Sequence, residues 1–311
     1  MRPSDVAPRP LASGPTPDTR LAGIAFMCAA PILLSMVDAT AKWLGQHVDP
    51  LLVMWARYAG NFVFACFFIN PWRTPSVWRT RRPVLQIVRG LLLVFCTIAN
   101  FVALQYVQLD QMVAIVFSMP FFVALMAGPL LGETIGWRRW AAILVGFAGV
   151  IVVAHPTAGI HPALLLVLAG AVSYAFYAVT TRLLAATDST ETTMFYAAAV
   201  GLVVSSVPLP LVWVVPQDPL VLGNLVMVGI YGFVGHLLLV LAHRRAPAGV
   251  LAPFVYTQIV WATLWGYLAF DQLPTLWTSA GAAIVIASGL YLINRERIDR
   301  AERALDATLA D

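Results

Sequence analysis

Long apolar runs separated by short polar connections dominate this sequence and decide what it can fold into. Ten of the runs approach or reach the roughly 20 residues that a helix needs to cross a bilayer. They lie at about 21–44, 51–70, 84–106, 111–131, 138–154, 161–184, 192–214, 220–241, 248–269 and 276–294. Turn residues mark the connections, as in PQDP at 216–219 and DQLP at 271–274. We therefore expect an all-α membrane protein with ten transmembrane helices.

The composition leads to the same expectation. Of the 311 residues, 60% are hydrophobic and 11% are charged, whereas a soluble domain carries about 25% charged residues. So few charges cannot cover a surface that faces water, and the bilayer must act as the solvent. The cysteines Cys28, Cys66 and Cys96 lie inside apolar runs without paired spacing, so we interpret them as small core residues and expect no disulfide and no bound metal. Residues 1–20, rich in Pro, Ser, Thr and Arg, are expected to form a disordered tail.

The basic residues fix the expected orientation. If both termini are cytoplasmic, ten spans place 17 of the 19 basic residues on the inner side: Arg2, Arg9, Arg20, Arg73, Arg79, Arg81, Arg82, Arg89, Arg138, Arg139, Arg182, Arg244, Arg245, Arg295, Arg297, Arg300 and Arg303. Cytoplasmic loops carry an excess of Lys and Arg in membrane proteins. The sequence therefore predicts a multi-pass protein of the bacterial inner (plasma) membrane, and the net charge of +4 indicates topology rather than nucleic-acid binding.

The two remaining basic residues, Lys42 and Arg57, share one depth with Asp38 near the outer end of the first two helices. Lys42 is the one lysine of the chain. It stands four residues after Asp38, so the two side chains share a helix face and can pair. One interpretation is a structural charge network, with Lys42 extending to the interface; the other is a gate or a site for substrate charges. Asp38 and His236 are candidate proton carriers, which leaves proton coupling and passive facilitation both open.

Other polar side chains fall within the apolar runs, where they usually face a cavity or a partner. We expect a substrate cavity lined by Asn61, Asn100, Ser118, Tyr174, Tyr177, Tyr231, His236, Tyr256, Gln258 and Trp261. Helix–helix hydrogen bonding is the alternative for each of them. Proline frees a backbone carbonyl and kinks a helix, so Pro31, Pro120 and Pro253 are candidate hinges, although each kink is equally compatible with a static role.

A weak internal repeat appears when the chain is shifted by about 140 residues. DATAKWL at 38–44 then matches AVTTRLL at 178–184, and AAILVGFAGVIVV at 141–153 matches GAAIVIASGLYLI at 281–293. The halves, at 21–154 and 161–294, would hold five helices each. Because five is odd, the second half enters the membrane inverted, and inverted repeats around a central site are a transporter architecture.

These patterns resemble a known family. The segment MPFFVALMAGPLLGETIGWRRWAAILVGFAGVIVV at 119–153 and the ARY at 56–58 are similar to EamA-type members of the drug/metabolite transporter superfamily. The resemblance covers about residues 20–294 and implies a basket of helices around a cavity that carries small metabolites, often by export. The second half departs from the pattern, since Phe270-Asp271 stands where the first half has Gly132-Glu133.

Within this superfamily the chain is similar to amino-acid exporters of the YddG type, and importers of S-adenosylmethionine or riboflavin also have similar sequences. The expected function is therefore secondary transport by alternating access. Export of amino acids, aromatic ones included, is the main interpretation, and import of a larger metabolite is the alternative. The expected partners are a small-molecule substrate and the lipid bilayer, in a monomer or weak oligomer.

Two other classes of protein are weighed against a transporter. The sequence has no Walker A, H-E-x-x-H, G-x-S-x-G or C-x-x-C motif, so we expect neither ATP hydrolysis nor any other enzymatic activity, and no cofactor. A membrane-embedded lipid-modifying enzyme would need a cluster of acids and histidines at the membrane face. A sensor or scaffold would need a soluble output domain, for which the tails at 1–20 and 295–311 are short.

Overall fold

A computed structural model describes residues 17–131, 136–154, 161–185, 187–246 and 248–310. Within these ranges the regular structure is helical: α1 Pro17–Leu44, α2 Pro50–Ile69, the short 3₁₀ turn η1 Pro75–Trp78, α3 Pro83–Ala103, α4 Leu109–Val116, α5 Met119–Leu131, α6 Trp137–Ala154, α7 Ala163–Leu184, α8 Thr190–Ser206, α9 Leu209–Val212, α10 Pro219–Arg245, α11 Ala248–Val255, α12 Thr257–Phe270 and α13 Leu276–Ala310. The pair Gly132-Glu133 and residues 1–16 of the expected tail lie outside the described residues, and α1 already begins within that tail, at Pro17.

Local sequence explains where several helices begin and end. Asp49 and Asp218 each precede a proline, and their carboxylates accept a hydrogen bond from the backbone N–H two residues later, at 2.8 Å in both cases. An acidic N-cap followed by proline satisfies the free N–H groups at a helix start. Asp271 ends α12 in the left-handed region with φ 53°, where a non-glycine residue is uncommon.

Eight helices in the described residues are long and apolar enough to span a membrane, against the ten that the sequence predicts. The expected span at 192–214 is shortened because α8 stops at Ser206, two residues before Pro208. The expected span at 248–269 is divided into α11 and α12. The span at 111–131 is divided as well, and counts as one of the eight only through its apolar segment Leu109–Met126.

Two helix breaks stand at corresponding positions of the two expected halves. The first separates α4 from α5 at Phe117 and Ser118, and the second separates α11 from α12 at Tyr256. Pro120 lies in the first turn of α5 and Pro253 lies within α11, three residues before the second break. Breaks occur near both expected hinges. Pro31, in contrast, lies inside α1, which continues unbroken to Leu44.

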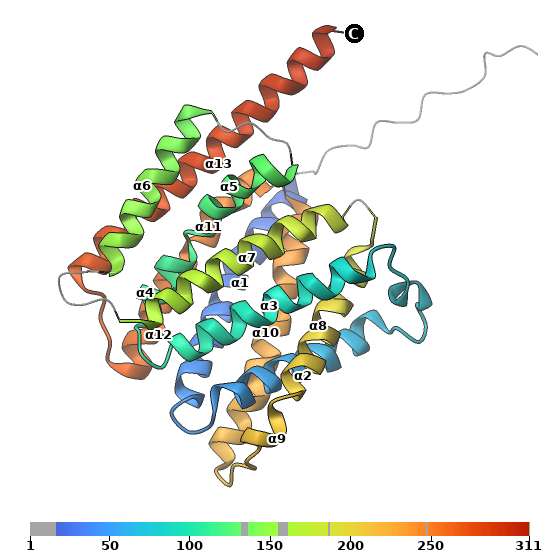
Figure 1. Ribbon diagram of the computed structural model, residues 1–311, viewed down its shortest axis with the longest axis vertical. Coiled ribbons are helices and arrows are strands. Elements are labelled where there is room, and N and C mark those ends of the chain that lie inside the picture. The colour runs from blue at the N-terminus through green and yellow to red at the C-terminus, as the bar shows by residue number, and fades with distance from the viewer. Residues whose placement is uncertain (1–16, 132–135, 155–160, 186, 247, 311) are drawn as a thin grey trace, which may run out of the picture.

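The helices pack as pairs across the bundle. Figure 1 shows α6 beside α13 at one edge, and α2 beside α8 toward the opposite edge. Between them α1 packs along α10, and α3 packs along α7. Glycine allows the closest approach, since a Cβ on Gly60 of α2 would lie 2.7 Å from the Cα of Gly229 on α10. The two backbones touch there, so any side chain at Gly60 would force them apart.

Interhelical contacts define the two ends of the bundle. At one end, which we call the basic end, Asp188 between α7 and α8 contacts Thr80 and Arg81 between α2 and α3, and Arg244 of α10 contacts Glu191 of α8. At the other end, which we call the closed end, the end of α1 meets the connection between α3 and α4, and α12 packs against α4.

Candidate functional site

Two adjoining lobes that share part of their lining form a cavity between the helices. The first, which we call the mouth lobe, has a volume of about 550 Å³, and the second, the deep lobe, has about 490 Å³. Both lobes are lined by the same six residues where they meet, at a region we call the waist: Arg57, Leu93, Tyr174, His236, Leu239 and His243. Each lobe alone lies within the range of about 300–1,000 Å³ that is typical of small-molecule sites.

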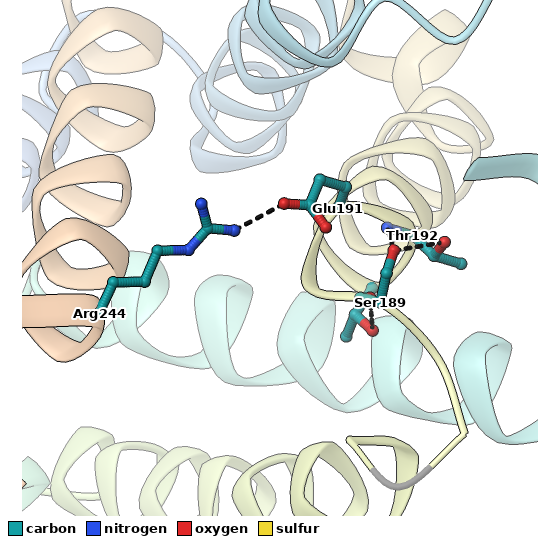
Figure 2. A network of polar contacts seen from close by, with 5 residues as sticks. Ser189, Glu191, Thr192 and Arg244 are labelled. Carbon is teal, nitrogen blue, oxygen red and sulfur yellow. Dashed lines mark hydrogen bonds and ion pairs between the residues drawn. The ribbon is translucent and has the colours of Figure 1, made fainter. Parts of the chain in front are cut away.

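The mouth lobe reaches the basic end, because Asp188, Thr190 and Arg244 belong to its lining. Figure 2 shows Arg244 of α10 and Glu191 of α8 pointing toward one another, with Nη2 and Oε1 2.6 Å apart. About half of each side chain is exposed, so solvent meets the lobe here. The α8 N-terminus beside the ion pair is capped by Ser189, whose hydroxyl accepts from the Thr192 N–H at 3.1 Å.

Hydrogen bonds to Asp188, which lies between α7 and α8, hold this end together. Asp188 accepts hydrogen bonds from the Thr80 hydroxyl, the Arg81 backbone N–H and the Gln86 amide. Partial burial by itself would raise the pKa of Asp188, but these hydrogen bonds to its charged form outweigh that effect and hold the pKa below its usual range. The carboxylate therefore ties the connection between α2 and α3 to the connection between α7 and α8.

Arg57 of α2 occupies the waist. Its Nη1 donates to the Thr97 hydroxyl at 3.3 Å, and its Nη2 lies 3.4 Å from Nε2 of His236 on α10. The guanidinium also lies over the rings of Tyr58 and Phe101, 5.9 and 5.6 Å from their centroids, at distances where a cation and an aromatic face attract. Three helices thus place one guanidinium at the junction of the two lobes.

The deep lobe carries a carboxylate and an aromatic wall. Asp38 of α1 accepts a long hydrogen bond of 3.5 Å from the Gln258 amide of α12. At the two helix breaks, the rings of Phe117 and Tyr256 meet edge to face with their centroids 4.8 Å apart. The breaks bring both side chains into the lining, and Asn100 of α3 joins them there.

The expected pairing of Asp38 with Lys42 is wrong. The Lys42 Nζ donates to the backbone carbonyl of Val107, lies 5.4 Å from the centroid of the Phe270 ring and is acted on by the charge of Asp110 at the start of α4. Side chains leave a helix toward its N-terminus, but the long lysine turns across to the neighbouring connection, whereas Asp38 faces the cavity.

Lys42 therefore belongs to the closed end, where apolar residues fill the space beyond the deep lobe. Leu44, Leu104 and Leu109 are fully buried there, from the ends of α1 and α3 and the start of α4. Apolar side chains packed without voids leave no path for a polar solute. In this structure the cavity is open to the basic end and sealed toward the closed end.

Seven of the ten expected cavity residues line it: Asn61, Asn100, Tyr174, Tyr177, His236, Tyr256 and Gln258. Of the described residues in the expected set, Ser118, Tyr231 and Trp261 lie outside both linings. Ser118 is fully buried at the first helix break. Tyr231 precedes His236 by five residues, which is about 140° around a helix, so it faces the core. Trp261 is partly buried and shares a helix face with Gln258 and Trp265, but it belongs to neither lining.

Arg89 is a lining residue that the sequence reasoning assigned only to topology. Its Nε donates to the Thr181 hydroxyl at 2.6 Å, its Nη2 to the Tyr177 hydroxyl at 2.6 Å and its Nη1 to the Thr193 carbonyl at 3.0 Å. It stands almost two turns inside α3, counted from Pro83. A charged residue so far into an apolar run was the signal for an interior role.

Comparisons with known proteins agree with this architecture. The model of the EamA-like transporter family matches residues 21–154 and again residues 161–295. The chain therefore belongs to the EamA-like transporter family, and it is a multi-pass membrane transporter. A crystal structure with 19% sequence identity covers 88% of this chain and 96% of its own length, with a TM-score of 0.61, and it supports the fold alone.

Three curated relatives have different names. An S-adenosylmethionine uptake transporter of Rickettsia bellii is 28% identical over 88% of this chain and 94% of its own length. A riboflavin transporter of Rhizobium johnstonii is 26% identical over 90% and 93%. A pseudopaline exporter of Pseudomonas aeruginosa is 28% identical over 88% and 97%. The expected amino-acid exporter of the YddG type is not confirmed by these names.

Proposed function

We propose that the chain carries a metabolite larger than an amino acid into the cell by alternating access, with S-adenosylmethionine and riboflavin as the model solutes. The observation that carries this proposal is the two-lobed cavity, sealed at one end and open at the other. Two lobes of about 490 and 550 Å³ leave room beyond that of an amino acid. Relatives named for S-adenosylmethionine uptake and riboflavin transport support the larger solute.

The proposal includes ten spans in two inverted halves. In such a repeat α1, α2 and α3 correspond to α7, α8 and α10. Exchanging the halves then turns the contact of α1 with α10 into that of α7 with α3. It also turns the contact of α2 with α10 into that of α8 with α3, and all four contacts are present. The pairs α2–α8 and α6–α13 map onto themselves. Such a correspondence is what a pseudo-two-fold axis in the membrane plane produces.

One place where the correspondence fails supports alternating access. At the closed end, α4 packs against α12. The exchanged pair is α5 with α11 at the basic end, and in the described residues that pair makes no comparable contact. A second state in which α5 meets α11 and α4 leaves α12 would seal the basic end and open the other.

The arginines support an orientation in which the basic end is cytoplasmic. The state seen here would then face inward, with both termini inside. Amino-acid export, the main expectation from sequence, is kept as the competing assignment. The relative named as a pseudopaline exporter bears on its direction and not on its solute.

The test is uptake of labelled S-adenosylmethionine, riboflavin and phenylalanine into proteoliposomes. Leu93 lines the waist, so Leu93→Trp is expected to block flux. Leu91, on the same helix and 44% exposed, provides the control Leu91→Trp, which is expected to transport normally. Flux of phenylalanine without the larger solutes would favour the amino-acid assignment. Flux of no solute, or equal flux through both variants, would contradict the proposed function.

A further inference from the structure

Three arginines line the cavity, and two of them have close partners. Arg89 uses its Nε and both terminal nitrogens in three hydrogen bonds of 2.6–3.0 Å. Arg244 is paired with Glu191 at 2.6 Å. Arg57 differs, because its two hydrogen-bond contacts with side chains are long, at 3.3 and 3.4 Å, and its buried Nε has no hydrogen-bond partner among the described residues. Since a guanidinium has five N–H donors, Arg57 keeps spare donors at the waist.

The surroundings of Arg57 leave its charge without a close carboxylate. Its charge acts on Asp38, yet within the described residues no carboxylate oxygen comes within 4 Å of its guanidinium nitrogens. A charge removed from water is costly unless it is paired and hydrogen-bonded. On the opposite helix, Gly232 leaves open the space beside the Nε of Arg57 and the unpartnered Oδ1 of Asn61.

Asp38 is the complementary case. It lines the deep lobe and receives one long hydrogen bond of 3.5 Å, from Gln258. Lys42, the cation expected to pair with it, is held at the closed end by Val107. The cavity therefore presents a carboxylate and a guanidinium that both face the same lobe, are both sparsely bonded and are not in contact with one another.

We propose that Arg57 binds the carboxylate, and Asp38 the cationic centre, of a zwitterionic solute that lies across the waist into the deep lobe. This assignment rests on the proposed function and narrows its substrate class. A guanidinium and a carboxylate form charge-assisted hydrogen bonds, often as a bidentate pair. The rings of Phe117, Tyr174 and Tyr256 line the same lobe and offer apolar faces to the rest of the solute. A neutral solute of similar size would leave both charges uncompensated.

The test compares ligands that differ by one charged group. Binding of S-adenosylmethionine, of its decarboxylated analogue and of riboflavin is measured on the purified full chain in nanodiscs. Wild type is expected to bind S-adenosylmethionine at least about tenfold more tightly than the decarboxylated analogue, because a charge-assisted hydrogen bond is lost. In Arg57→Gln that ratio is expected to fall to about one. Arg73→Gln, the same charge change at an exposed residue outside the cavity, is expected to keep the wild-type ratio.

The ratio separates a binding role from a structural one, because a misfolded variant loses affinity for both ligands alike. Asp38→Asn is expected to weaken S-adenosylmethionine binding while preserving its preference over the decarboxylated analogue. Equal binding of the two ligands by wild type, or an unchanged ratio in Arg57→Gln, would overturn the assignment. Tight binding and uptake of riboflavin without the zwitterion would overturn it too, yet would leave the proposed transport function standing. Loss of uptake for every solute would contradict the proposed function instead.

Discussion

The ring of Phe117 lies edge-on to the ring of Tyr256, with the centroids 4.8 Å apart. Each residue stands at a helix break, and the two are 139 positions apart, close to the shift of the internal repeat. Residues related by a two-fold axis can touch only near that axis. The contact therefore agrees with an inverted repeat whose axis passes through the deep lobe.

Adding one methyl group beside this contact is expected to disable the cavity. A Cβ on Gly289 of α13 would lie 2.0 Å from the hydroxyl oxygen of Tyr256, so Gly289→Ala must displace the ring. Uptake is expected to fall at least about tenfold, since the displaced ring changes the shape of the deep lobe. Flux in proteoliposomes measures the effect. Gly223→Ala is the matched control, because nothing lies within 4 Å of its Cβ; a normal rate in Gly289→Ala would show that the ring position is unimportant.

Sequence reasoning located most helices because long apolar runs and the arginine distribution are properties of whole spans. It found the positions of both breaks through Pro120 and Pro253, but not that α4–α5 and α11–α12 are separate helices. For the site, the positions of Asp38 and Arg57 within apolar spans indicated that both side chains face the interior of the bundle. It did not show which partner each has, because spacing within one helix is silent about neighbouring helices. The contact of Lys42 with the α3–α4 connection was therefore missed.

A double-mutant cycle can measure the interaction energy between Lys42 and each of its possible partners. Lys42 donates to the Val107 carbonyl and faces the charge of Asp110, and both Lys42 and Asp110 are buried. Lys42→Met is expected to destabilise the fold by about 3–5 kcal/mol, the cost of leaving a buried charge without its partner. Thermal unfolding in detergent measures it.

Combining Lys42→Met with Asp110→Asn should recover part of this loss, since neither charge then remains. Combining it with Asp38→Asn should instead be additive, because Asp38 faces the cavity. If Asp38→Asn recovered the lost stability and Asp110→Asn were additive, Lys42 would pair with Asp38, as the sequence suggested.

Acid is expected to loosen the basic end through Asp188. Partial burial opposes ionisation of this carboxylate, but its hydrogen bonds outweigh that effect and hold its pKa below the usual range, so folding is favoured by the ionised carboxylate. This stabilisation is fully present above the unfolded-state pKa and is lost as the pH falls through the lower folded-state pKa. Asp188 is only partly buried, and solvent screens its contacts, so the effect is expected to be below about 1 kcal/mol.

The measurement is the melting temperature of wild type and Asp188→Asn between pH 6 and pH 3. The difference in melting temperature between the two proteins should shrink as the pH falls. Protonation of Asp188 removes the same carboxylate charge that the substitution removes. A difference that stays constant across this range would mean that the carboxylate charge contributes nothing at this position.

The ion pair between Glu191 and Arg244 is expected to affect the conformational equilibrium more visibly than the stability. Both side chains are about half exposed, at 46% and 54%, and such pairs contribute about 0–1 kcal/mol. The pair joins α8 to α10 in the state that is open at the basic end, so Arg244→Gln should shift the population toward the alternate state by up to about fivefold. Labelling of a cysteine placed at Thr190, in the lining of the mouth lobe, should slow accordingly. Exchanging the two charges, as Glu191→Arg with Arg244→Glu, should restore the rate, whereas unchanged labelling in Arg244→Gln would show that the pair does not hold this state.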